Sequence, residues 1–221
     1  MPYSLCLFDL DGTLTDPKLG ITKSFQYALS SFGINEELDD LTKFIGPPLR
    51  ESFAKIYGFS ASDTEIAVAK FREYFAETGI YENTVYPGIP EMLRVLKDSG
   101  KTLAIVTGKA TVYSTRILEH FGLDKYFSFI SGDEMDGSLT KNGKKELIHI
   151  AINALDRESK MPVAMIGDRE HDIFGAREAS VDSIGNTWGY GSRKELESAG
   201  ATWIVDTIDE LCLLLMEDGT Q

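Results

Sequence analysis

The sequence contains little cysteine and little histidine. Its two cysteines, Cys6 and Cys212, lie far apart in a chain of 221 residues. They cannot supply a four-thiolate metal site, and a disulfide scaffold is not expected at this chain length. The three histidines, His120, His149 and His171, are scattered and form no cluster of the kind that binds zinc. We therefore expect neither a zinc centre nor a disulfide-stabilised secreted domain.

Long hydrophobic runs are also absent. No apolar segment approaches the ~18 residues that are needed to cross a bilayer. The N-terminus lacks the basic region and the long apolar run of a secretion signal. We therefore expect a cytoplasmic protein with no membrane partner.

Positive charge is scarce as well. The chain has 22 Lys and Arg residues against 35 Asp and Glu residues, for a formal net charge of −13. A surface of this sign repels nucleic acid, because binding to nucleic acid depends on cations that neutralise its phosphates. A nucleic acid polymer is therefore excluded as an expected partner. A small phosphate ester remains possible, because it needs only local cations, a metal ion or oriented backbone amides. Both a monomer and a homodimer remain open.

What the sequence does contain is an alternation of strand and helix patterns. Five short apolar runs have the composition of buried strands in a parallel sheet. They cover residues 4–8, 102–106, 127–130, 163–166 and 203–205. Helical periodicity is found between and after them, at residues 89–96, 109–121, 144–155, 173–179 and 208–215. The alternation predicts an α/β fold with a Rossmann-like parallel sheet core.

Residues 17–80 interrupt this alternation. Ile21, Phe25 and Leu29 lie on one helical face, a second helical pattern covers residues 66–75, and no convincing strand is found. We predict a small helical domain over residues 17–80, inserted after the first strand, and an α/β core made of residues 1–16 and 81–221.

Polar side chains follow three of the predicted strands. Asp9 and Asp11 follow the first, Thr107 follows the second, and Asp168 and Asp172 follow the strand at 163–166. Because ligands of open parallel sheets bind beyond the carboxyl ends of the strands, we expect these groups to meet. Clustered carboxylates repel one another unless a cation neutralises them. A hard, oxygen-ligated ion such as Mg²⁺ suits such a cluster.

Four motifs in this order resemble those of the haloacid dehalogenase superfamily. The segment Asp9-Leu10-Asp11-Gly12-Thr13 resembles the first motif, Thr107 the second and Lys144 the third, while Gly167-Asp168-Arg169-Glu170-His171-Asp172 resembles the fourth. Because the second acid of the first motif is present, the chain resembles the phosphate-transferring branch rather than the dehalogenases. The helical insertion resembles the cap domain of the phosphoglycolate phosphatase and 5′-nucleotidase-like branch.

The resemblance implies a Mg²⁺-dependent phosphatase that acts through an aspartyl-phosphate intermediate. It implies that Asp9 is the nucleophile and that Asp11 is the general acid and then the general base. It implies that Thr107 bonds to the phosphoryl group and that Lys144 neutralises its charge. Lys145 remains a rival for the role of Lys144, and a helix cap remains the alternative role of Thr107.

The remaining implied sites concern phosphate, metal and substrate. The backbone amides near Leu10 and Gly108 are expected to bind phosphoryl oxygens. The implied metal ligands are Asp9, Asp11 through its backbone carbonyl, Asp168 and Asp172, the last of which could instead orient Lys144. The implied substrate-specificity residues are Lys23, Gly46 and Arg50, although Lys23 and Arg50 could also be ordinary surface cations.

The expected substrate is a small phosphorylated metabolite, with phosphoglycolate and a nucleoside 5′-monophosphate as leading candidates. A phosphomutase and a non-enzymatic metabolite-binding regulator are the alternatives. Gly189-Tyr190-Gly191 is too short for a dinucleotide-binding fingerprint and is expected to form a loop.

Overall fold

The computed structural model describes residues 3–141, 143–158 and 160–217. Its chain divides into two compact units. The first contains the described residues up to Thr15 and from Val85 onward, and the second is Asp16–Thr84. The predicted insertion at residues 17–80 lies inside the second unit. Two short strands, β2 (Thr15–Asp16) and β3 (Thr84–Val85), pair where the chain leaves and re-enters the first unit.

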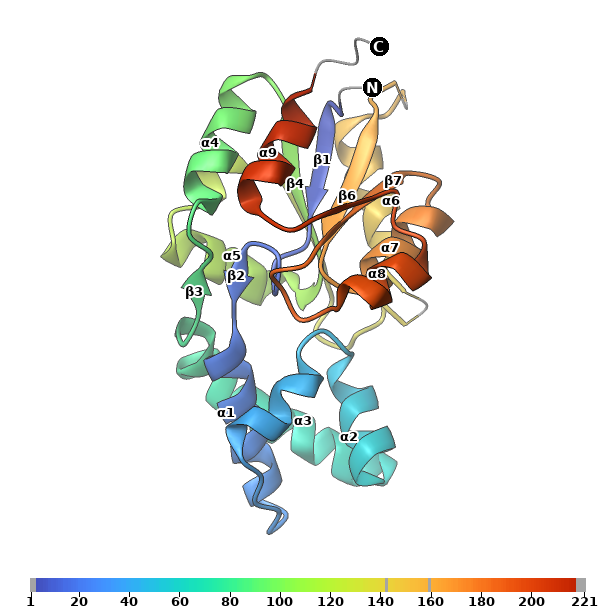
Figure 1. The fold of residues 1–221 in the computed structure, drawn as a ribbon. Helices are drawn as coiled ribbons and strands as arrows, with labels where there is room; N and C mark the ends of the chain where they lie inside the picture. Colours follow the sequence, from blue (N-terminus) through green and yellow to red (C-terminus); the bar gives the residue numbers. More distant parts are fainter. Residues whose placement is uncertain (1–2, 142, 159, 218–221) are drawn as a thin grey trace. The chain divides into compact units, whose positions relative to one another are not determined.

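The first unit is built on a six-stranded parallel sheet with the strand order β5-β4-β1-β6-β7-β8 (Figure 1). The strands are β1 (Leu5–Phe8), β4 (Thr102–Ala110), β5 (Phe129–Asp133), β6 (Val163–Gly167), β7 (Asp182–Asn186) and β8 (Trp203–Val205). Strand β1 lies between β4 and β6 and is completely buried, which explains its unbroken apolar sequence. The predicted α/β fold with a parallel sheet is confirmed.

The register of the central strands brings their carboxyl ends to one edge. Phe8 of β1 pairs with Ile105 of β4 on one side and with Ile166 of β6 on the other. The residues that follow Phe8 and the end of β6 therefore lie at the same edge, beside β4, which continues along β5 through Ala110. Asp9 and Asp168 belong to this edge.

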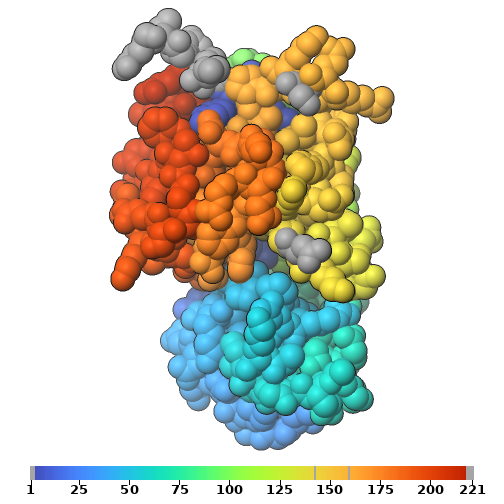
Figure 2. Space-filling model, turned by 90° about the vertical axis from the view of Figure 1, so that its right-hand side faces the viewer, coloured from blue at the N-terminus to red at the C-terminus, as the bar shows by residue number. Residues whose placement is uncertain are grey.

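Six α-helices flank the sheet in the described part of the first unit. They are α4 (Ile89–Asp98), α5 (Thr111–His120), α6 (Lys145–Leu155), α7 (Glu170–Glu178), α8 (Arg193–Ala199) and α9 (Ile208–Met216). Figure 2 shows the face on which the segment of α7 lies between those of α6 and α8, and these neighbours are in contact. Leu147, Ile148 and Ala151 of α6 pack with Leu5 and Leu7 of β1 in the core. None of the described helices is long and apolar enough to cross a membrane.

Several boundaries differ from the prediction. The helix expected to begin at residue 109 begins at Thr111, because β4 continues through Ala110 with a shift of register after Thr107. Strand β5 lies two to three residues later than predicted, at Phe129–Asp133. Strand β7 and helix α8 were not predicted. Strand β7 reads Asp-Ser-Ile-Gly-Asn, so Ile184 is its only large apolar residue and no hydrophobic run marks it.

The second unit is helical. It contains α1 (Lys18–Ser30), α2 (Leu49–Tyr57) and α3 (Ala61–Glu77), with short 3₁₀ helices η1 (Leu38–Phe44) and η2 (Gly79–Tyr81). The helical face predicted at Ile21, Phe25 and Leu29 lies on α1, and the pattern at residues 66–75 lies in α3. Phe25 of α1 is the centre of its core, with ring centroids 4.7 Å from Phe44, 5.0 Å from Phe53 and 5.1 Å from Phe71.

Replacing Phe25 with alanine is expected to destabilise the second unit by about 3–5 kcal/mol, because the change removes a completely packed ring and leaves a cavity. The free energy of unfolding is to be measured by urea denaturation followed by far-UV circular dichroism. Ile66→Ala, at an exposed position of α3, is the control and should change stability by no more than about 0.5 kcal/mol. A cost below about 1 kcal/mol for Phe25→Ala would contradict the central role of this ring.

Candidate functional site

The turn after β1 presents the acids of the first motif. The N–H of Asp9 donates to the carbonyl of Ile166 at 2.8 Å, which keeps Asp9 in line with the sheet. The chain then folds back so that the Leu10 carbonyl accepts from the N–H groups of Thr13, Leu14 and Thr15. Gly12 has a φ of +80°, and a Cβ there would lie 2.3 Å from a carboxylate oxygen of Asp168. Glycine is therefore required at this position both by the backbone and by the neighbouring acid.

Three carboxylates from separate parts of the first unit meet beyond this turn. Oxygens of Asp9, Asp168 and Asp172 lie within 4.8 Å of one another. All three residues are buried, with exposed fractions of 7%, 1% and 0%. Asp9 Oδ1 and Asp168 Oδ1 have no hydrogen-bond partner. Burial, together with the charges of Asp172 and Asp9, raises the pKa of Asp168 to about 8. The cluster therefore has both the unsatisfied acceptor atoms and the excess negative charge that suit a bound cation.

Lys144 is the cation that the chain itself brings to this cluster. Its Nζ lies 2.8 Å from Asp9 Oδ2 and also donates to Asp172 Oδ1. Burial alone would lower the pKa of Lys144, but the Asp172 and Asp9 carboxylates reverse that effect and raise it. Lys145 is exposed, so Lys144 is the lysine of this pair that lies among the carboxylates. Gly175 of α7 allows the approach, since a Cβ there would lie 2.8 Å from the Cβ of Lys144.

Asp172 is held by the start of α7. Its Oδ2 accepts from the N–H of Arg169, and its Oδ1 accepts from Lys144. A Cβ on Gly167 would lie 2.1 Å from the Cγ of Asp172, so the end of β6 must be glycine. The Arg169 side chain is itself paired with Glu195 of α8 at 2.8 Å. The aspartate that closes the fourth motif is thus fixed at both of its oxygens.

Asp11 lies in a different environment from Asp9. Its Oδ2 forms an ion pair of 2.8 Å with Lys109 Nζ, and the two side chains are 15% and 8% exposed. Burial raises the pKa of Asp11, and the charge of Lys109 opposes that rise. The sequence prediction gave no role to Lys109, although its place two residues after Thr107 could have indicated one.

The predicted phosphate-binding positions lie at the same edge of the sheet. Thr107 is buried and its hydroxyl accepts from the N–H of Lys109 at 3.3 Å. Gly108 is exposed, and the Leu10 side chain is buried in the core. No hydrogen bond among the described residues joins Thr107 to the carboxylates, so its predicted contact with phosphate stays a prediction.

The loop after β7 was predicted only as a loop, yet it packs directly on the carboxylates. The N–H of Tyr190 donates to Asp168 Oδ2 at 2.7 Å. The Asn186 amide donates to the carbonyl of Gly12 at 3.0 Å, and the Trp188 indole donates to the carbonyl of Thr13 at 3.1 Å. This loop therefore fixes both the first-motif turn and Asp168. Its two glycines, separated by one residue, were the sequence feature that could have indicated such close packing.

A Cβ on Gly189 of this loop would lie 2.3 Å from the Gly12 carbonyl and 2.4 Å from the Cβ of Asp168. A Cβ on Gly191 would lie 1.9 Å from the carbonyl of Asp168. The two glycines are needed because backbone and carboxylate come too close for any side chain.

The predicted substrate-specificity residues belong to the second unit. Lys23 is paired with Glu82 at 2.5 Å, and Arg50 holds Glu65 through its Nε at 2.6 Å and its Nη2 at 3.0 Å. Gly46 has a φ of +104°. The structure therefore shows partners of Lys23 and Arg50 inside their own unit, and their action on substrate stays a prediction.

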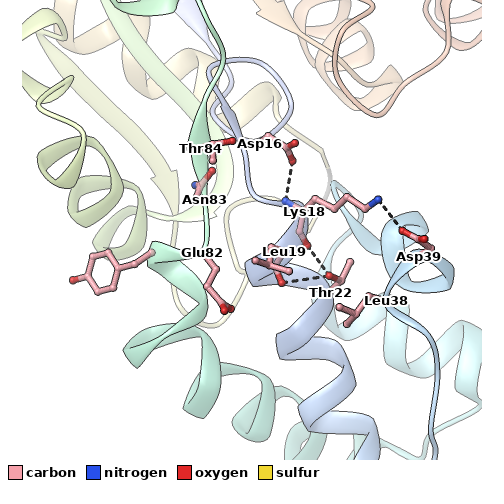
Figure 3. Close-up of a pocket in the computed structure, with 10 residues that line it drawn as sticks. Asp16, Lys18, Leu19, Thr22, Leu38, Asp39, Glu82, Asn83 and Thr84 are labelled. Atoms are coloured by element: carbon pink, nitrogen blue, oxygen red, sulfur yellow. Dashed lines mark hydrogen bonds and ion pairs between the residues drawn. The ribbon is translucent and has the colours of Figure 1, made fainter.

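The second unit also has a pocket of about 500 Å³ near the N-terminal end of α1 (Figure 3). Lys18 lies in its wall, paired with Asp39 at 2.8 Å, while the Lys18 N–H donates to Asp16. Leu19 and Leu38 add apolar surface. Lys23, Gly46 and Arg50 do not line this pocket, and Arg50 instead lines a second pocket.

Comparison with known proteins identifies relatives across almost the whole chain. The model of the family described as haloacid dehalogenase-like hydrolase matches residues 6–186. A 5′-nucleotidase of Pseudomonas aeruginosa is 46% identical over 199 residues, which are 89% of this chain and 88% of that protein. The crystal structure of "a predicted phosphatase" from Clostridium acetobutylicum is 46% identical and has a TM-score of 0.92, covering 98% of this chain and 99% of that one. The predicted superfamily resemblance is confirmed.

Other relatives have different names. Tyrosine-protein kinase PtkA of Mycobacterium tuberculosis is 37% identical over 212 residues, covering 94% of this chain and 70% of that protein. A phosphoglycolate phosphatase of Agrobacterium fabrum is 31% identical over 194 residues, covering 84% of this chain and 81% of that protein. Relatives named for different reactions thus align with the larger part of the same chain.

Replacing Gly189 with alanine is expected to lower turnover at least tenfold, because the added methyl group must displace Asp168 or the first-motif turn. Phosphatase activity and the melting temperature are to be measured together. Gly200→Ala is the control: its φ of +84° makes alanine strained, but no atom lies within 4 Å of the added Cβ and the site is not involved. The control should lose stability and keep its activity. Equal activity losses in the two variants would contradict the positioning role of the loop.

Proposed function

The chain belongs to the haloacid dehalogenase-like hydrolases and is a phosphatase of that family, and we propose that it removes phosphate from a small metabolite through an aspartyl-phosphate on Asp9. The observation that carries the proposal is the buried cluster of Asp9, Asp168 and Asp172 with Lys144 bonded to two of its members. A lysine shared between two acids, beside acceptor atoms without partners, suits a dianionic phosphate and a metal ion bound side by side.

The residues at this site fit Mg²⁺. Asp9 and Asp168 would hold the ion, because each has a buried Oδ1 without a hydrogen-bond partner. The backbone carbonyl of Asp11 and, through water, Asp172 complete the proposed ligand set. When bound, Mg²⁺ supplies positive charge that reduces the repulsion between the nucleophilic carboxylate and the phosphate. Asp172 also orients Lys144 through the contact described above.

Two of the aspartates carry the proposed reaction. An oxygen of the Asp9 carboxylate attacks phosphorus while the bond to the leaving-group oxygen breaks, and Asp11 gives its proton to that oxygen. Asp11 then takes a proton from water, the water oxygen attacks phosphorus, and the bond to Asp9 breaks to release inorganic phosphate. Lys144, the Thr107 hydroxyl and the amides near Leu10 and Gly108 bind the phosphoryl oxygens during both steps.

We propose a nucleoside 5′-monophosphate or phosphoglycolate as the substrate. The names of two relatives support these classes, and the net charge of −13 argues against a nucleic acid polymer. We assign the Asp16–Thr84 unit as the cap that limits the substrate to a small molecule, with Lys23, Gly46 and Arg50 as its specificity residues. We propose that the protein acts in the cytoplasm, as a monomer or a homodimer.

The proposal is tested by assaying the purified protein with Mg²⁺ against a panel of phosphorylated metabolites, ranked by kcat/KM, with release of inorganic phosphate as the readout. We expect hydrolysis of one of the two proposed classes. Asp9→Asn should abolish turnover, because the neutral amide cannot form the acyl phosphate, and should leave the fold intact. Near-normal hydrolysis by this variant would refute the nucleophile. Phosphate moved to a second hydroxyl without release would indicate a phosphomutase.

The metal site is tested by a measurement that does not need activity. Millimolar Mg²⁺ should raise the melting temperature of the metal-free protein, because a ligand that binds only the folded state stabilises it. Asp168→Asn should remove this response, since it replaces one proposed ligand. Asp98→Asn, at an exposed position of α4, is the control and should respond like the wild type. The assignment would be overturned if Mg²⁺ left the melting temperature of the wild type unchanged, or raised that of Asp168→Asn as much as that of the wild type.

A further inference from the structure

We propose that Lys109 is a positioning residue that holds the Asp11 carboxylate for proton transfer, separately from Lys144, which serves the phosphoryl group. This inference rests on the proposed function of Asp11 as general acid and base. Its basis is the buried contact of 2.8 Å between Lys109 Nζ and Asp11 Oδ2.

The position of Lys109 depends on a bulge in strand β4. Thr107 pairs with Gly132 of β5 and Ala110 pairs with Asp133, so that Gly108 and Lys109 are extra residues between two consecutive paired positions. A bulge of this kind turns a side chain away from the direction it would have in a regular strand. Here it brings the lysine to the carboxyl end of the sheet, where Asp11 lies.

The neighbouring strand leaves room for the bulge. A Cβ on Gly132 would lie 2.8 Å from the Lys109 carbonyl and 2.8 Å from the backbone N of Thr111. The N–H of Lys109 also donates to the Thr107 hydroxyl at 3.3 Å, which ties the bulge to the residue before it. The backbone of Lys109 therefore packs closely against β5, and its side chain is only 8% exposed, unlike that of an ordinary surface cation.

The two lysines form ion pairs with different acids. Lys144 contacts Asp9 and Asp172, and Lys109 contacts Asp11. The Asp11 Oδ1 atom is buried and has no hydrogen-bond partner, so Lys109 holds one oxygen of the carboxylate and leaves the other for the reacting proton. An acid that transfers protons must keep one oxygen directed at the substrate, and an ion pair at the other oxygen supplies that orientation.

The test compares Lys109→Met and Lys109→Arg with the wild type on two substrates. One is the best alkyl phosphate of the metabolite panel, whose leaving oxygen needs a proton. The other is p-nitrophenyl phosphate, whose leaving group departs without one. We expect Lys109→Met to lower kcat/KM for the alkyl phosphate about 10–100-fold. The loss for p-nitrophenyl phosphate should be at least five times smaller, and Lys109→Arg should recover part of the activity.

Binding of phosphate separates this role from that of a phosphate ligand. The inhibition constant for inorganic phosphate should change by less than threefold in Lys109→Met. Lys101→Met is the matched control: Lys101 immediately precedes the other end of β4, and its Nζ donates to the carbonyl of Tyr3 at 2.7 Å. Its kinetic constants should equal those of the wild type. A tenfold weaker inhibition by phosphate in Lys109→Met, or equal losses on the two substrates, would overturn the proposal.

A double variant distinguishes a loss of positioning from a loss of folding. Lys109→Met leaves a buried carboxylate without its partner, whereas Asp11→Asn combined with Lys109→Met removes both charges and should restore the melting temperature. In the Asp11→Asn background, the lysine change should lower kcat/KM less than twofold, because there is no acid left to position. The inference would be refuted if the two substitutions lowered kcat/KM independently, so that the loss in the double variant equalled the product of the two single losses. A wild type with no phosphatase activity would refute the proposed function itself, which is a distinguishable result.

Discussion

The structure of the site depends on the burial of several negative charges in one place. Asp9, Asp168 and Asp172 are removed from water within 4.8 Å of one another, and such an arrangement is unfavourable unless positive charge enters with it. Lys144 supplies one charge and bonds to two of the acids. The buried oxygens that still lack partners account for the fit to a metal ion, and in the proposed function a phosphate group would lie beside that ion and Lys144.

Close packing around the carboxylates determines where glycine must stand. A Cβ at Gly12, Gly167 or Gly189 would overlap atoms of Asp168 or Asp172. The site is therefore shaped by backbone that approaches the acids from three different segments, and each approach is possible only without a side chain. The N–H of Tyr190, which bonds to Asp168, comes from one of these segments. The close approach of the backbone to the buried carboxylates thus determines where the acids lie and where glycine is needed.

The strand ends could be predicted from the sequence, and the connections around them could not. Asp9 and Asp168 follow apolar runs, and a parallel sheet brings such ends together, so their meeting followed from pattern and topology. Strand β7 was not predicted because its sequence is mostly polar. The role of the following loop, which bonds to Asp168, was missed for the same reason. The position of the Lys109 side chain was not predicted for another reason. Its direction depends on a bulge opposite Gly132, and the hydrophobic pattern of β4 does not indicate such an irregularity of the backbone.

The two aspartates of the first motif lie in different surroundings, which suits the two chemical roles proposed for them. Asp9 and Asp11 are two residues apart, yet one faces Lys144 and two further acids while the other faces Lys109. In the proposed mechanism, Asp9 would attack phosphorus and Asp11, whose carboxylate is paired with a different lysine, would exchange the proton. The whole of this arrangement lies in the first unit, and none of its residues comes from Asp16–Thr84. With the specificity residues in Asp16–Thr84, as proposed, they could vary without disturbing the reacting groups, which is consistent with relatives of different names sharing one aligned chain.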